Sequence, residues 1–112
     1  MEREQPPHWT GTQSQIEWAE QIRPQVEAEF DRVSNILSSA AQRQDSVKQA
    51  ETQILIGIVA EKRAEVLAHA SAGYFIKEWR DLGAGQVRRM IAADARYQSV
   101  LASRAERRQS NL

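Results

Sequence analysis

The sequence predicts an all-α protein, and three observations support this prediction. Apolar residues recur every three or four positions from Ile16 to Leu37, which is the period of one helix face. No run of five residues alternates apolar and polar side chains, so no strand is expected. The chain has 112 residues and no cysteine, which allows one domain with one core and excludes a disulfide framework.

The predicted architecture is a small bundle built on a long antiparallel helical hairpin. One helix is expected from Thr12 to about Ala41, and a second from Asp45 to about His69. A short aromatic helix and one or two C-terminal helices should close the bundle. We expect residues 1–11 to form a flexible arm, residues 12–108 a single helical domain, and residues 109–112 a tail.

The first helix should begin at Thr12, after an opening that contains two prolines and has no regular period. Thr12 and Gln15 match a capping box, in which each side chain accepts a hydrogen bond from the backbone of the other residue. Pro24 lies inside the apolar stripe and cannot donate its backbone hydrogen bond. Because the stripe keeps its phase across Pro24, we expect a kink rather than the start of a new helix.

The second helix should begin after Asp45, whose side chain can cap it. The two predicted helices have similar lengths, about 40 Å each at 1.5 Å per residue. Such a pair leaves one side of the apolar stripe uncovered, so the rest of the chain must pack there.

The remaining chain supplies shorter helices. An aromatic helix is expected from Tyr74 to Leu82, and the Gly-Ala-Gly sequence at residues 83–85 should end it. A further helical pattern starts at Val87. Asp94 can cap a separate final helix, so a break near Ala93 is expected as one of two alternatives.

Few residues suggest catalysis or metal binding. Glu61, Glu65 and His69 are spaced four apart and share one helix face. A di-iron site in a helical bundle needs further carboxylates and a second histidine on facing helices. We therefore interpret this face as solvated, and we expect no metal, no cofactor and no enzymatic activity.

The charges are distributed unevenly along a chain whose net charge is zero. Residues 74–112 carry eight basic and four acidic side chains, whereas residues 1–73 carry seven basic and eleven acidic ones. Either the basic segment binds nucleic acid or an acidic partner, or it pairs internally with the acidic first helix. The candidate anion-binding residues are Gly85, Arg88, Arg89, Arg96 and Arg104. The sequence pI of about 6.7 is low for a DNA-binding domain, so any nucleic-acid binding should be weak.

Aromatic residues next to arginines indicate a surface for a protein partner. Tryptophan, tyrosine and arginine are enriched at the energetic centres of interfaces. The candidate partner-binding residues are Trp18, Arg23, Tyr74, Trp79 and Arg80. For the two tryptophans, however, closure of the bundle core is the favoured interpretation, with the indole N–H groups finding partners at its rim.

Two segments carry a resemblance to a known family. Gly11 to Arg23 reads GTQSQIEWAEQIR, and Ala72 to Arg80 reads AGYFIKEWR. The first segment resembles the opening G-[ST]-x-x-Q-I-x-W-A-x-x-I-R of small, uncharacterised helical domains from bacteria, phages and plasmids. The second is similar to a short aromatic segment found further on in those proteins. The resemblance implies a helical module of mobile-element origin, an accessory or inhibitor protein, and it brings no catalytic residues.

The expected function is that of a non-enzymatic protein-interaction module, and the alternative is nucleic-acid binding through the arginine-rich C-terminal helix. The longest strongly apolar run, Ile54 to Ala60, is shorter than the roughly 20 residues of a membrane span. The opening lacks the pattern of a signal peptide, so a cytoplasmic location is expected. A homo-oligomer is compatible with the sequence.

Overall fold

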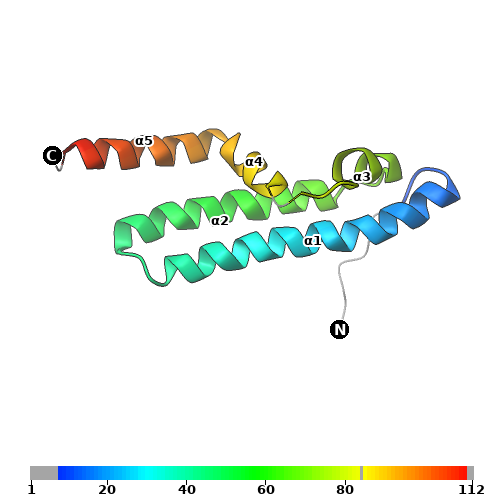
Figure 1. Cartoon of the computed structure of the whole chain (residues 1–112), viewed down its shortest axis with the longest axis horizontal. Coiled ribbons are helices and arrows are strands. Elements are labelled where there is room, and N and C mark those ends of the chain that lie inside the picture. The colour runs from blue at the N-terminus through cyan, green and yellow to red at the C-terminus, as the bar shows by residue number, and fades with distance from the viewer. Residues whose placement is uncertain (1–7, 84, 111–112) are drawn as a thin grey trace.

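A computed structural model describes residues 8–83 and 85–110 of the chain. The described residues form five helices and no strand, so the all-α prediction is confirmed. The helices are α1 (Gln13–Ala41), α2 (Ser46–Leu67), α3 (Ala72–Trp79), α4 (Gln86–Ala92) and α5 (Ala95–Ser110). The molecule is elongated, with principal extents of 60 × 31 × 19 Å, and Figure 1 shows the two long helices side by side.

The first helix starts as the sequence predicts. The Thr12 hydroxyl accepts a hydrogen bond from the Gln15 backbone N–H at 3.2 Å, and the Gln15 side chain accepts one from the Thr12 N–H at 2.9 Å. α1 then continues through the exposed Pro24 to Ala41. The turn after Ala41 leads to α2, where the Asp45 carboxylate accepts a hydrogen bond from the Lys48 N–H at 3.0 Å. α2 ends at Leu67, two residues before the predicted end.

The core lies between the two long helices and under α3. Phe30 on α1 and Ile58 on α2 are completely buried, as their central places in the apolar stripes predict. α3 packs against α1 and adds the buried Phe75 and Trp79 to this core. The ring of Trp79 lies 5.8 Å from the ring of Phe30.

The described part of the N-terminal segment departs from the prediction of a flexible arm over residues 1–11. Thr10 forms a parallel β-bridge with Ser71, in which the Thr10 N–H donates to the Ala70 carbonyl and the Ala72 N–H donates to the Thr10 carbonyl, both at 2.9 Å. Trp9 packs edge-on against Phe75 at 5.4 Å. Backbone pairing and aromatic packing thus fix residues 9–11 to the start of α3. Residues 1–7 of the predicted arm lie outside the described residues.

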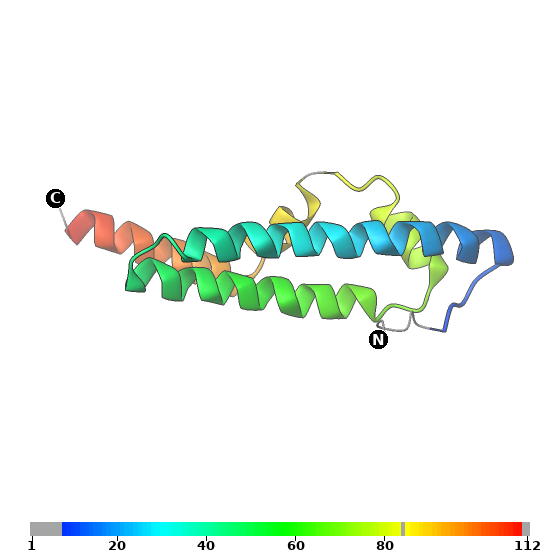
Figure 2. The ribbon, with the colours of Figure 1, turned by 90° about the horizontal axis from the view of Figure 1, so that it is seen from below.

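The C-terminal third contains three short helices. α3 starts and ends earlier than predicted, and the break near Ala93 separates α4 from α5. α5 reaches Ser110, so residues 109 and 110 of the predicted tail are helical, while 111 and 112 lie outside the described residues. Viewed from below in Figure 2, α5 lies along α2 near the α1–α2 turn. Among the described helices, none is long and apolar enough to span a membrane.

Phe30→Ala should destabilise the protein by about 3 to 5 kcal/mol, because it opens a cavity in a fully buried site. Chemical denaturation followed by circular dichroism measures the change. The control is Ile36→Ala on the same helix, whose side chain is 47% exposed and should cost less than about 1 kcal/mol. A loss below about 1 kcal/mol for Phe30→Ala would contradict the core assignment.

Candidate binding groove

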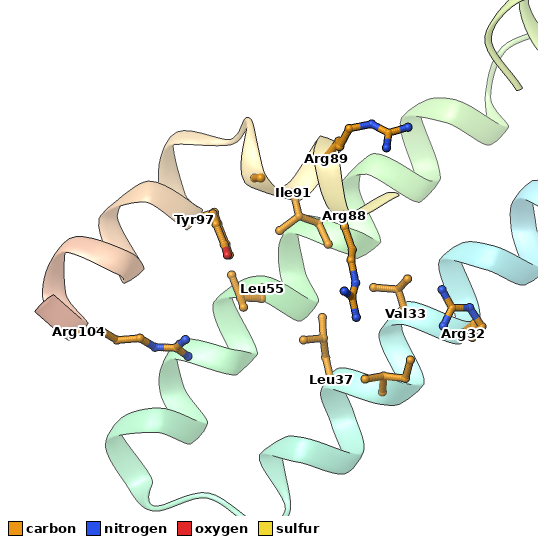
Figure 3. Close-up of a pocket in the computed structure, with 11 residues that line it drawn as sticks. Arg32, Val33, Leu37, Leu55, Arg88, Arg89, Ile91, Tyr97 and Arg104 are labelled. Atoms are coloured by element: carbon orange, nitrogen blue, oxygen red, sulfur yellow. The ribbon is translucent and has the colours of Figure 1, made fainter. Parts of the chain in front are cut away.

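A groove lies between the C-terminal part of α1 and the α4–α5 segment, with α2 at its base (Figure 3). Its volume is about 440 Å³, within the range of protein binding pockets. We call it the arginine-rimmed groove, and its lining residues are Arg32, Val33, Ile36, Leu37, Leu55, Arg88, Arg89, Ile91, Ala92, Tyr97 and Arg104.

The groove exists because α2 covers only one side of the apolar stripe of α1, and no other described helix covers the second side over the last third of α1. α5 packs on α2 and α4, and within the described residues its backbone makes no contact with α1. α4 crosses near both long helices but spans only seven residues. Ile36 therefore remains 47% exposed and Leu37 half-buried. An apolar strip of α1 is left facing solvent between two helical walls.

The four arginines around the groove differ in their partners. Arg32 is held by Glu29, to which its Nε donates at 3.1 Å, and Arg104 donates to Glu51 at 3.2 Å. The side chains of Arg88 and Arg89 make no hydrogen bond or ion pair with any other described residue. In Figure 3 Arg88 points from α4 toward the floor of the groove, whereas Arg89 points away from it. Arg88 is thus free to bind a ligand inside the groove, and Arg89 lies at its outer rim.

Glu51 fastens α5 to α2. Its carboxylate accepts two hydrogen bonds from Arg107, both at 2.8 Å, and one from Arg104, while its side chain is only 10% exposed. These arginines, Arg107 first, hold the pKa of Glu51 below its ordinary value, although burial opposes the shift. α5 buries one residue, Val100, so ion pairs carry much of its attachment.

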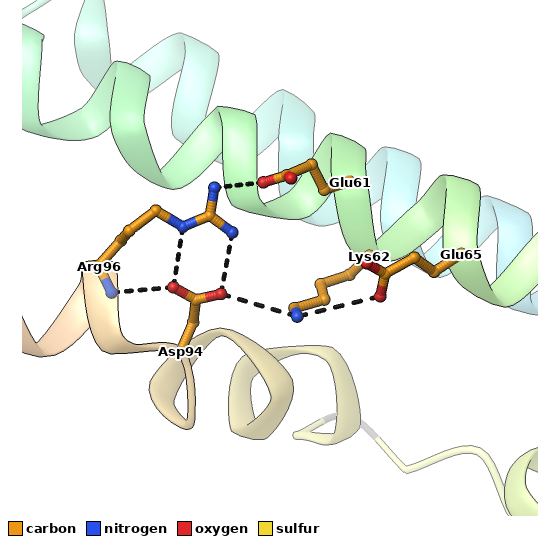
Figure 4. A network of polar contacts seen from close by, with 5 residues as sticks. All are labelled: Glu61, Lys62, Glu65, Asp94 and Arg96. Carbon is orange, nitrogen blue, oxygen red and sulfur yellow. Dashed lines mark hydrogen bonds and ion pairs between the residues drawn. The ribbon is translucent and has the colours of Figure 1, made fainter.

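A second polar network fixes the corner between α4 and α5 (Figure 4). The Asp94 carboxylate accepts hydrogen bonds from the backbone N–H, Nε and Nη2 of Arg96 at 2.9, 3.0 and 2.9 Å, and Lys62 lies 3.6 Å away. Arg96 also pairs with Glu61 on α2. The hydrogen bonds from Arg96 hold the pKa of Asp94 well below its ordinary value, and they raise the pKa of Arg96.

The structure separates the predicted anion-binding residues. Arg88, Arg89 and Arg104 line the groove, but Arg96 belongs to the network at the corner. Gly85 is the N-cap residue of α4, which has no side-chain cap because glycine lacks a side chain. The Arg89 guanidinium lies close to Gly85. The expected internal pairing occurs, but its acidic partners lie on α2 and at Asp94. The prediction that they lie on the first helix was wrong for Arg96, Arg104 and Arg107.

The predicted partner-binding residues also divide. Trp18 is 44% exposed, and the Arg80 guanidinium lies 5.9 Å from its ring centre, so these two form a small surface patch. Trp79 is 2% exposed, which removes it from the surface set and confirms the core alternative for this residue. Its indole N–H donates to the half-buried Tyr74 hydroxyl at 3.1 Å. Arg23 is 8% exposed, so its assignment to a partner surface was wrong as well.

Arg23 has an internal role instead. Its Nη2 donates to the Leu67 carbonyl at 3.1 Å, in the last turn of α2. A cation there satisfies a helix carbonyl without an intrahelical partner and suits the negative end of the helix dipole.

The residues considered for metal binding are dispersed. Glu61 pairs with Arg96, and the His69 ring stacks on Tyr74 at 3.6 Å. Within residues 8–83 and 85–110, no three histidines or carboxylates are grouped to hold a metal ion. The sequence did not identify Ile36, Leu55 and Tyr97 as residues of a groove. The one sequence feature that pointed to a groove was that the apolar stripe of the first helix is longer than the short helices predicted to pack on it.

Comparisons of the chain with protein-family models, with curated proteins and with solved structures find no match.

The ion pairs of Glu51 predict a pH-dependent stability. Because the folded-state pKa lies below the ordinary value of 4.5, this contribution is complete above that value and disappears as the pH falls through the folded-state pKa. Glu51→Gln should lower the free energy of unfolding by about 1 to 3 kcal/mol at neutral pH. The difference in the free energy of unfolding between Glu51→Gln and the parent protein should become smaller at acidic pH.

Urea denaturation at neutral pH and at about pH 2 measures both quantities. Glu106→Gln, an exposed change on α5, the helix that carries Arg104 and Arg107, is the control and should have little effect at either pH. A Glu51→Gln loss that is the same at both values would contradict the role of the ionised carboxylate.

Proposed function

We propose that the chain is a non-enzymatic protein-interaction module, whose arginine-rimmed groove binds an apolar segment of a partner protein that also carries carboxylates. The observation that carries this proposal is the uncovered apolar surface beside Arg88, whose side chain points into the groove and makes no hydrogen bond or ion pair with any other described residue. An apolar concave surface with a charged rim is typical of a protein-binding site. The resemblance of residues 11–23 to mobile-element domains agrees with an accessory or inhibitor role.

The shape of the groove favours a macromolecular segment over a small ligand. A site for a small molecule usually buries most of the ligand surface, whereas this groove is open along the exposed side of Ile36. Arg88 and Arg89 are also exposed, so a partner could reach them directly. Guanidinium groups bind carboxylates with two parallel hydrogen bonds, which adds specificity to the apolar contact.

Nucleic-acid binding is the weaker alternative. Arg96, Arg104 and Arg107 already donate to carboxylates of the same chain. A phosphate would have to displace these carboxylates, and the remaining free cations do not form a continuous track.

The proposed function can be tested by site-specific photo-cross-linking in the cells that carry the gene. A photoreactive amino acid replaces Ile36 in the groove, and the control places it at Ile54, which is 45% exposed on α2 outside the groove. We expect the Ile36 position alone to yield a discrete protein adduct, whose cross-linked peptide contains apolar residues flanked by aspartate or glutamate.

The adduct should be lost in Arg88→Glu and retained in Lys77→Glu, which makes the same charge change on α3, outside the groove lining. Identical adducts from positions 36 and 54, or a cross-linked segment without acidic residues, would reject the proposal. An adduct with nucleic acid would favour the alternative function.

Nucleic-acid binding should be micromolar or weaker at physiological ionic strength, because few free arginines are left to bind phosphates. Fluorescence anisotropy with labelled duplex and single-stranded probes, over a range of salt concentrations, measures the affinity and its salt slope. Nanomolar binding to a defined sequence at about 150 mM salt would make nucleic-acid binding the favoured function instead of protein binding.

A further inference from the structure

We infer that the partner segment in the arginine-rimmed groove is an amphipathic α-helix with carboxylates beside its apolar face, which completes a four-helix arrangement with α1, α2 and α5. This inference rests on the proposed function and specifies the secondary structure and the charge of the occupant.

The arrangement of the walls leaves the position of one helix open. α1 and α5 both pack against α2, and their backbones do not come into contact in the part of the chain that is described. The groove follows the space between them (Figure 3). Neighbouring helices in bundles pack 8 to 10 Å apart, so a helix laid over the groove could contact α1 on one side and α5 on the other.

The walls also argue against an extended segment. The α1 and α2 parts of the groove lie within long helices, whose backbone groups are already paired inside each helix. A strand gains affinity by adding its backbone to an exposed sheet edge, and none lines this groove. A strand bound here would leave its own N–H and C=O groups facing apolar side chains, at a cost in free energy. A helix carries its backbone hydrogen bonds with it.

The α1 side of the groove carries apolar residues at helical spacing. Val33, Ile36 and Leu37 lie three and four residues apart on α1, so they form one ridge. Leu55 on α2 and Tyr97 on α5 continue the apolar surface to the opposite wall. Ridges of this kind interdigitate with residues at positions i, i+3, i+4 and i+7 of a second helix.

The charge of the rim specifies the flanks of that helix. Arg88 points into the groove and has no partner among the described residues, whereas Arg32 and Arg104 are held by Glu29 and Glu51. Glutamates near the α4 end of a bound helix would thus meet free guanidinium groups. Lysines there would meet uncompensated positive charge, so the site should discriminate by charge as well as by shape.

The test uses three designed peptides of about 18 residues with the intact protein. The first places leucines at i, i+3 or i+4, and i+7, with glutamates beside them. The second has the same composition with leucines at every other position. The third replaces each glutamate of the first with lysine. Titrations followed by amide chemical shifts of the labelled protein give the affinity and the location of each peptide.

We expect the first peptide to bind at least tenfold more tightly than the other two, to become helical, and to shift the amides of Ile36, Leu55 and Tyr97. Arg88→Glu should weaken its binding about tenfold, and Lys77→Glu should leave it within twofold. Circular dichroism of both variants checks that they remain folded, which the exposure of both residues favours.

The inference would be overturned if the first peptide did not bind at about 1 mM, or if the second peptide bound equally well. It would also be overturned if the shifts were centred on Trp18 instead of the groove, or if light scattering showed a doubling of mass because a second copy blocks the groove. Tighter binding of dodecanoate than of the peptide would overturn it in favour of a lipid. The cross-linking experiment decides the proposed function separately. An adduct at position 36 with an extended segment would leave that function standing while the helix inference fails.

Discussion

The apolar stripe of α1 is longer than the helices that follow the hairpin can cover, and the other features of the structure depend on this mismatch. α1 has 29 residues, about 43 Å, whereas α3 and α4 have eight and seven residues, about 12 and 10 Å. α2 buries one side of the stripe along its length. α3 covers the other side near Phe30 and α4 crosses beyond it, so that Ile36 and Leu37 remain at the edge of a groove.

Charge pairing explains why α5 does not fill that groove. α5 has only Val100 buried, but Arg104 and Arg107 reach Glu51, and Arg96 reaches Glu61 on the same side of α2. Such pairs are directional, and they place α5 over α2 instead of over α1. The Arg96–Glu61 pair is exposed, and such pairs contribute little and are screened by salt. Because α5 also buries a single apolar residue, it is held less firmly than the two long helices, which share a continuous apolar core.

The same ion pairs reduce the number of C-terminal arginines that are available to bind a ligand. A basic C-terminal segment would suggest a track for phosphates if all its arginines were free, but in the described structure several of them pair with carboxylates of the same chain. Arg96, Arg104 and Arg107 stabilise the fold, whereas Arg88 and Arg89 stand beside an apolar surface without partners. The Arg88 guanidinium next to the exposed Ile36 and the half-buried Leu37 suits a partner that is both acidic and apolar. This combination is why we favour a protein segment over nucleic acid.

The sequence by itself determined the helices, because each depends on local physics. The period of apolar residues, the capping box at Thr12 and Gln15, and the cap at Asp45 act within a few residues, so the hairpin and the burial of Phe30 could be predicted. The break near Ala93 was only one of two alternatives that the sequence left open. The place of Arg23 could not be predicted, and for Trp79 the sequence left both the core and the surface open. The position of a residue in the sequence indicates on which face of its helix it lies, but not which other element packs against that face. Only the tertiary structure decided that the Trp9–Gly11 segment pairs beside Ser71, that Glu51 collects two arginines from α5, and that a groove opens between α1 and α5. Each of these features depends on contacts between residues far apart in the chain, whose relative positions follow from how the short helices pack and not from any local pattern.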